Sequence, residues 1–258
     1  MPGDDLDLIT AAVLRAGELA RGYVGAEARR WNKPDDAGPV TEADIAVNDL
    51  LEEALRSARP DYGWLSEESE DTGDRRDREF VFVIDPIDGT RSFAEGSNTW
   101  AHSVAVCRDG AATAGAIYLP LRDKLFTAAL GSGAYLNGAR IEASTVEDPN
   151  AASVLATKPS IAPERWPRGV PGFRREHRPS LAYRLGLVAQ GRFEAMVTFR
   201  PTWEWDVAAG ALIVTEAGGV CTDAAGKALR FNQAVPRHGG VVAAGPNIHA
   251  PLLEAMRA

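Results

Sequence analysis

The 258-residue chain has few of the residues that build disulfide frameworks and metal sites, and it has no long apolar run. It contains two cysteines, Cys107 and Cys221, and four histidines. The cysteines stand apart in apolar surroundings without a CxxC spacing, so we expect small buried residues, not disulfide partners or metal ligands. No apolar run reaches the roughly 18 residues of a membrane span. The first residues, MPGDDLDL, are acidic where a secretory signal would be basic. We therefore expect a cytoplasmic protein.

Positive charge is also in deficit. Lys and Arg number 28 against 36 Asp and Glu, a formal net charge of −8. This sign disfavours nucleic-acid and anionic-membrane partners, although an acidic protein can still bind an anion through an intervening cation. The apolar content of 45% and the charged content of 25% are ordinary for a globular protein. At roughly 150 residues per domain, the length fits one large domain or two intimate ones.

Apolar periodicity and capping signals predict several helices. Apolar residues recur at three- and four-residue steps from Leu6 to Tyr23. A capping-box-like start at Thr41–Asp44 opens a second helix that stops at Pro60. The intervening residues 31–39 are rich in turn formers and predict a loop. Further helices are expected over residues 181–190, 206–217 and 248–257.

Strands are predicted between these helices. Phe80–Ile84 reads as a buried strand that Pro86 should end, because proline cannot donate to a ladder. Short β-like segments with turn signals between residues 100 and 141 predict an antiparallel meander, and 194–199 and 240–244 add two strands. The mixture indicates an α/β or α+β fold. Residues 145–179 have no firm period, so we expect two lobes, 1–145 and 146–258, in one compact unit.

The segment DPIDGT carries the most chemical information. Asp85 and Asp88 follow the buried strand, and two carboxylates so close repel each other unless they share a cation or proton. Carboxylate and carbonyl oxygens are the ligands that Mg²⁺ prefers. Gly89 permits close backbone approach, and free N–H groups at a helix start accept phosphate. Taken alone, however, the segment is better explained as a simple turn.

Two other acidic segments accompany it. Glu67 and Glu68 follow a short apolar strand, and Asp206 lies between tryptophans and a helix of small residues. Taken singly, the two glutamates are explained by a solvated loop and Asp206 by a helix N-cap.

Together these segments resemble the inositol monophosphatase superfamily, the Mg²⁺-dependent, lithium-sensitive phosphatases of sugars and nucleotides. VTEAD, SEES, DPIDGT, GAYLNG, LVAQGR and WDVAAGALIVTEAGG all occur in the family's order and span most of the chain. The resemblance implies a phosphoric monoester hydrolase with an α/β (α+β) layered sandwich of alternating helix and sheet layers. It also implies a homodimer that binds a small phosphate ester.

The resemblance implies a role for each matched residue. Two or three Mg²⁺ ions are expected per active site. The implied metal ligands are Glu67, Asp85, the Ile87 carbonyl, Asp88 and Asp206; the implied catalytic residues are Glu67, Thr90 and Asp44; and the implied substrate-binding residues are Asp88, Gly89, Thr90 and Asp206. Asp44 and Thr90 are expected to be hydrogen-bonded and, with Glu67, to orient and deprotonate the attacking water. Glu68 is expected to lie near the metal ligands but not to bind the metal itself. The histidines, His102, His177, His238 and His249, lie outside the motifs and receive no catalytic role.

The substrate signals divide. Residues 32–36, 39–44 and 65–68 resemble the branch that removes the 3′-phosphate from 3′-phosphoadenosine 5′-phosphate, whereas GAYLNGARI and AAGALIVTEAGG resemble inositol monophosphatases proper. We predict an inositol-1-phosphate phosphatase, with a 3′(2′),5′-bisphosphate nucleotidase as the alternative. Histidinol phosphate and fructose 1,6-bisphosphate are further candidate substrates. A non-catalytic regulatory module is the alternative from another functional class. Such a module would be expected to have lost metal ligands, whereas this sequence has a suitable residue at every expected ligand position.

Substrate selection is expected at Arg91, Arg178–Arg184 and Phe199–Glu204. A second phosphate would favour Arg184 or Arg200, because a guanidinium binds phosphate with two hydrogen bonds, yet each arginine taken singly is better explained as a solvated surface charge. Two departures from the family bear on specificity. Pro179-Ser180 replaces the usual Gly-Ser or Gly-Thr pair, and Phe199 occupies a position that is often acidic. Both weaken a strict inositol preference, and a broad specificity is compatible with them.

Overall fold

Two amphipathic helices form the first layer of the computed structural model, which describes residues 2–24, 29–32 and 38–257. Helix α1 (Pro2–Arg21) and helix α2 (Glu42–Ala58) confirm the two predicted helices. The capping box of α2 is also confirmed, since the Thr41 N–H donates to Asp44 Oδ2 over 2.8 Å. Part of the predicted loop, residues 33–37, lies outside the described residues. On either side of it, strands β1 (Arg30–Asn32) and β2 (Pro39–Thr41) pair antiparallel.

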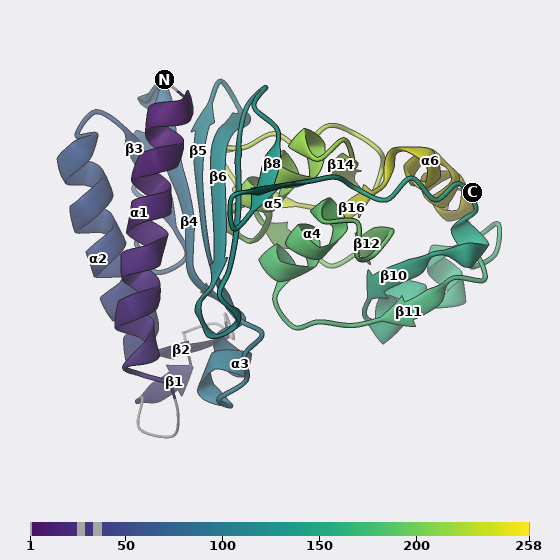
Figure 1. Cartoon of the computed structure of the whole chain (residues 1–258), viewed down its shortest axis with the longest axis horizontal. Coiled ribbons are helices and arrows are strands. Elements are labelled where there is room, and N and C mark those ends of the chain that lie inside the picture. Colours follow the sequence, from purple (N-terminus) through teal and green to yellow (C-terminus); the bar gives the residue numbers. More distant parts are fainter. Residues whose placement is uncertain (1, 25–28, 33–37, 258) are drawn as a thin grey trace.

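A seven-stranded sheet forms the second layer, in the order β3 to β9. Only the β3–β4 pairing is parallel, and β4 to β9 form the predicted antiparallel meander. The strands are β3 (Gly63–Ser66), β4 (Phe80–Asp88), β5 (Ala101–Arg108), β6 (Ala111–Leu119), β7 (Lys124–Ala129), β8 (Ala134–Leu136) and β9 (Ala139–Ile141). Helices α1 and α2 cover one face of this sheet (Figure 1).

Strand β4 corrects one prediction. Pro86 does not end the strand, which continues to Asp88 through a register shift between Asp85 and Asp88. A β-bulge tolerates proline because one residue of the bulged strand needs no ladder hydrogen bond. Both aspartates therefore belong to the sheet, and the short helix α3 (Thr90–Ala94) follows them at once.

Helices α4 (Leu181–Ala189) and α5 (Glu204–Glu216) form the middle layer. They lie between the first sheet and a second sheet of five strands, and α6 (Pro246–Met256) covers the outer side of that second sheet (Figure 1). The predicted sandwich of alternating helix and sheet layers is confirmed. The second sheet has the order β11 (Arg174–Glu176), β10 (Ser153–Ala156), β12 (Ala195–Thr198), β16 (Val241–Ala244) and β14 (Val220–Asp223). Strands β13 (Thr202–Trp203) and β15 (Arg237–His238) form a separate pair.

Residues 145–179 contain structure that the sequence does not predict. Strands β10 and β11 and three short 3₁₀ turns lie in residues 145–179, where the sequence has no clear period. The division into lobes at residue 145 stays a prediction. Both cysteines are free, and Cys107 is buried whereas Cys221 is partly exposed. Over the described ranges, none of the helices combines the length and apolar character needed to cross a membrane.

The contact between α5 and β6 depends on a glycine. A Cβ at Gly115 would lie 3.0 Å from the Ala209 carbonyl oxygen, which is backbone and cannot rotate away. We expect Gly115→Ala to lower the free energy of unfolding by about 1–3 kcal/mol, because overpacking strains a filled core. Denaturant unfolding measures this. The control is Gly3→Ala, around which nothing lies within 4 Å. An unchanged stability for Gly115→Ala would contradict the close α5–β6 contact.

Candidate active site

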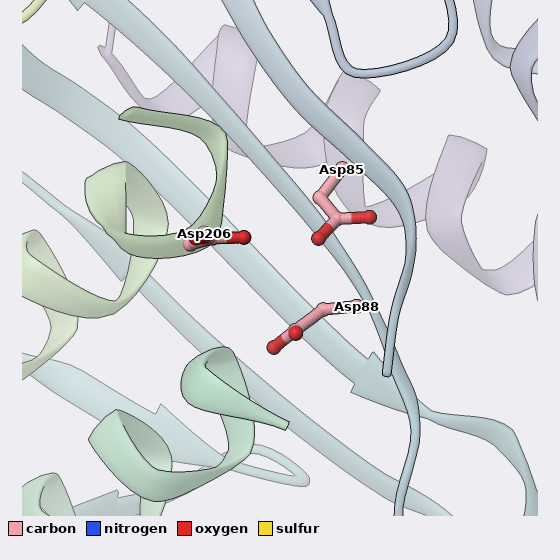
Figure 2. A group of neighbouring side chains, drawn as sticks. All are labelled: Asp85, Asp88 and Asp206. Carbon is pink, nitrogen blue, oxygen red and sulfur yellow. The ribbon is translucent and has the colours of Figure 1, made fainter. Parts of the chain in front are cut away.

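Three carboxylates from distant parts of the chain converge beside the β4 bulge. Asp85 and Asp88 come from the end of β4, and Asp206 comes from the first turn of α5 (Figure 2). One carboxylate oxygen of each lies within 4.8 Å of the others. Because α5 packs against β4, β5 and β6, the middle layer of the fold brings Asp206 to this point.

Asp206 is not the N-cap of α5, so that interpretation is wrong. Trp203 occupies the cap position, and Asp206 is the third residue of the helix. Its Oδ2 accepts a hydrogen bond from the Trp203 N–H over 3.3 Å. A carboxylate three residues after the cap can reach back to the cap N–H, and Figure 2 shows that it extends toward Asp85 and Asp88.

Asp88 is tied to the start of α4. Its Oδ2 accepts hydrogen bonds from Ser180 Oγ and from the Ala182 N–H, both over 2.6 Å. Ser180 also caps α4 by accepting from the Tyr183 N–H over 3.0 Å. Proline at 179 removes an N–H but leaves these donors in place. Ser180 is a functional residue that was not predicted, although a serine directly before an apolar helix is an N-cap signal.

The site concentrates negative charge away from water. Burial, followed by the charges of Glu67 and Asp88, raises the pKa of Asp85 well above its ordinary value. Burial, followed by the charges of Asp88 and Glu67, does the same to Asp206. Burial also raises the pKa of Asp88 to about 6. A bound divalent cation would relieve this repulsion.

The donor set fits a hard divalent cation. Asp85 Oδ1 is buried and has no hydrogen-bond partner among the residues that the structure describes. Buried polar atoms without partners are uncommon, and an absent ion is one of their ordinary explanations. Carboxylate and carbonyl oxygens suit Mg²⁺, Mn²⁺ or Ca²⁺ better than the softer metals.

The predicted hydrogen bond between Thr90 and Asp44 is confirmed. Thr90 Oγ1 lies 3.0 Å from Asp44 Oδ1 and 3.1 Å from the Ile87 carbonyl oxygen. Asp44 is buried. It forms the capping box of α2 with Thr41 and also accepts the hydrogen bond from Thr90. Gly89 adopts a φ of 97° as the N-cap of α3, a conformation that favours glycine.

Glu67 lies at the same pocket, directly after β3. Its N–H donates to the Ile84 carbonyl over 3.1 Å, which fixes the start of the SEES segment beside β4. Burial first, and the charge of Glu67 in addition, raise the pKa of Asp44 as well as those of the three aspartates. The five predicted acids therefore act on one another electrostatically.

The pocket has a volume of about 620 Å³, and basic side chains also line it. Arg184 is only 4% exposed, so the prediction of a solvated surface charge is wrong for it. Burial lowers the pKa of Arg184 to about 10. Its guanidinium lies 3.0 Å from Nε2 of His177, a pocket residue that lies outside the family motifs. Other described lining residues include Glu67, Asp85, Ile87, Asp88, Gly89, Thr90, Arg91, Thr157, Pro179, Arg200 and Asp206.

A sequence model described as "Inositol monophosphatase family" matches residues 5–258. The chain therefore belongs to the inositol monophosphatase family, a family of phosphoric monoester hydrolases. It is 34% identical over 239 residues to an inositol-1-monophosphatase of Rhizobium meliloti, covering 86% of each chain. It is also 34% identical to a histidinol-phosphatase of Chlorobaculum parvum, covering 86% of this chain and 87% of that protein. The solved structure of Thermotoga maritima IMPase superposes with a TM-score of 0.85 at 27% identity, covering 98% and 96% of the two chains.

The raised pKa of Asp88 predicts a pH-dependent stability in metal-free protein. Between about pH 4 and pH 6 the folded carboxyl keeps a proton that the unfolded one has released, so its contribution to stability falls as the pH rises. Asp88→Asn removes this effect. We therefore expect the variant to gain roughly 3 kcal/mol relative to wild type between pH 4 and pH 7.

Denaturant unfolding in the presence of a chelator measures this gain. The matched control is Asp61→Asn, which is exposed and should change stability by less than about 0.5 kcal/mol at either pH. If Asp88→Asn gains no stability relative to wild type over this pH range, the pKa of Asp88 is not raised in the folded protein.

Proposed function

We propose that the protein is a Mg²⁺-dependent phosphomonoesterase that hydrolyses a small phosphate monoester, with inositol 1-phosphate as the first candidate. The observation that carries the proposal is the cluster of two buried carboxylates, Asp85 and Asp88, and the half-buried carboxylate of Asp206 in the wall of a pocket. The pocket volume of about 620 Å³ is in the range of small-ligand sites.

The cluster has enough oxygen ligands for more than one ion. Glu67, Asp85 and the Ile87 carbonyl would hold one Mg²⁺, and Asp85, Asp88 and Asp206 would hold a second. When bound, such ions lower the pKa of water, neutralise phosphoryl oxygens and stabilise the leaving alkoxide.

Protein groups would position and deprotonate the attacking water. The Thr90 hydroxyl donates a hydrogen bond to Asp44. The lone pairs of Thr90 Oγ1 are then free to accept a hydrogen bond from water. The Glu67 carboxylate takes the proton as the water oxygen attacks phosphorus and the ester P–O bond breaks. The proton then returns to the leaving alkoxide. Asp44 thus acts through Thr90. The Asp44 side chain is buried, and this keeps the Thr90 hydroxyl in one orientation.

The phosphate itself would lie over the β4–α3 junction. Gly89 and Thr90 begin α3 and line the pocket, and their N–H groups would donate to phosphate oxygens. The Asp88 and Asp206 carboxylates would contact the alcohol part of the substrate as well as bind the metal.

A second candidate function, hydrolysis of 3′-phosphoadenosine 5′-phosphate, has a specific observation in its favour. Arg184 and Arg200 line the same pocket, and burial first and the positive charge of Arg200 in addition lower the pKa of Arg184. A second phosphate on the substrate would offset this repulsion. Histidinol phosphate and fructose 1,6-bisphosphate remain further candidates, since the named relatives differ in their substrates.

Removing one ligand charge tests the metal assignment. We expect Asp206→Asn to lower kcat/KM with Mg²⁺ by more than about 100-fold, because a ligand should matter at least as much as the groups that orient ligands. The assay measures phosphate release from inositol 1-phosphate, 3′-phosphoadenosine 5′-phosphate, fructose 1,6-bisphosphate and histidinol phosphate. Asp61→Asn, an exposed site outside the pocket lining, is the control and should retain wild-type rates. Wild-type turnover in Asp206→Asn would refute the assignment.

Arg200 separates the two candidate substrates. The residue is exposed and lines the pocket, so Arg200→Gln should leave the core intact. If the substrate carries a second phosphate, the variant should lose roughly 10- to 100-fold in kcat/KM for 3′-phosphoadenosine 5′-phosphate, because hydrogen bonds to charged groups are strong. Its kcat/KM for inositol 1-phosphate should stay near wild type. Arg192→Gln, an exposed arginine outside the pocket lining, is the matched control. Equal losses on both substrates would count against the bisphosphate function.

A further inference from the structure

His102 lies on β5 directly opposite the bulge that carries the aspartates. Asp85 pairs with Ser103 and Asp88 pairs with Ala101, so two residues of β4 face the single residue His102. A bulge of this kind leaves one residue without its ladder partner and turns the strand locally. His102 is 0% exposed, although the family resemblance gives it no role.

The imidazole supplies the contact that the ladder cannot. His102 Nδ1 lies 2.5 Å from the Pro86 carbonyl oxygen. A carbonyl oxygen only accepts hydrogen bonds, so Nδ1 must carry the proton and donate. The side chain therefore attaches the bulge to β5 at the residue whose own nitrogen has no proton to donate.

An aromatic side chain packs against the rest of the ring. Trp100 contacts it edge to face with ring centroids 5.4 Å apart, and Phe93 of α3 contacts Trp100 in the same way at 4.9 Å. His102 Nε2 is buried without a hydrogen-bond partner in the described part of the chain. An apolar side chain would fill this space without an unpaired nitrogen, so the hydrogen bond from Nδ1 explains why a histidine is present.

We propose that His102 is a positioning residue that sets the geometry of the metal-binding turn. It holds the Pro86 carbonyl toward β5, and this fixes the peptide that follows. The next carbonyl, that of Ile87, lies at the other end of the turn, where Thr90 Oγ1 is 3.1 Å away. The turn is thus held at both ends, and Asp85 and Asp88 extend from it. The inference rests on the proposed function only in assigning a metal to these oxygens.

Three variants separate donation from packing. His102→Leu keeps an apolar side chain in the space but removes the donor. His102→Asn places an amide N–H at the same number of bonds from Cβ as Nδ1, whereas His102→Gln places it at the position of Nε2. We expect His102→Leu to weaken Mg²⁺ binding, measured by calorimetry, by about 10- to 100-fold, the usual effect of losing a group that orients a ligand. His102→Asn should restore most of the affinity, and His102→Gln should not.

Two calorimetric results would overturn the inference. The first is wild-type Mg²⁺ affinity in His102→Leu, and the second is equal weakening in the Leu and Asn variants, which would show that the hydrogen-bond donor at the Nδ1 position does not set the affinity. Thermal melting of the metal-free variants shows whether each one folds.

A separate measurement on metal-free wild type does not depend on the proposed function. The ¹⁵N spectrum of the His102 ring should report the tautomer protonated at Nδ1. The tautomer protonated at Nε2 would overturn the inference even if the enzyme hydrolyses phosphate esters. If wild type binds no Mg²⁺, the proposed function fails, and the tautomer still decides whether His102 anchors Pro86.

Discussion

Repulsion among buried carboxylates is the constraint on which the rest of the structure depends. Asp85, Asp88 and Asp206 lie close together, and Glu67 and Asp44 add their charges to the same pocket. Such an arrangement destabilises the folded chain unless a cation is bound. The surrounding layers must therefore hold the acids in place, and the apolar cores on both faces of the first sheet supply the stability for this.

Helix starts provide much of the support for these acids. Asp44 and Asp206 are each the third residue of a helix and accept an N–H from the cap residue, Thr41 or Trp203. Asp88 accepts an N–H from the first turn of α4. Helix N-termini carry partial positive charge and stabilise nearby anions. The starts of α2, α4 and α5 thus each donate a backbone N–H to one of these acids, and the net charge of −8 partly reflects this local chemistry.

The sequence predicts the parts of the fold that have strong local signals. Helices α1 and α2 follow from apolar periodicity and, for α2, from its capping signal, and the meander follows from its turns. Strands β10 and β11 are three to four residues long, too short for a periodic signal. The burial of Arg184 depends on the elements packed against α4, and the contact of His102 with Pro86 joins β5 to β4, so no local pattern reveals them. The motifs identify the site acids because their order is shared with the family, and the lobe boundary and the homodimer remain predictions.

Anomalous diffraction from crystals soaked in Mn²⁺ is the most direct test of whether the converging carboxylates bind divalent cations. Mn²⁺ prefers the same oxygen ligands as Mg²⁺ and scatters strongly enough to be located. We expect anomalous peaks between the carboxylates of Asp85, Asp88 and Asp206. Absence of any peak among these three side chains, in crystals of protein that hydrolyses phosphate esters with Mn²⁺, would contradict this expectation.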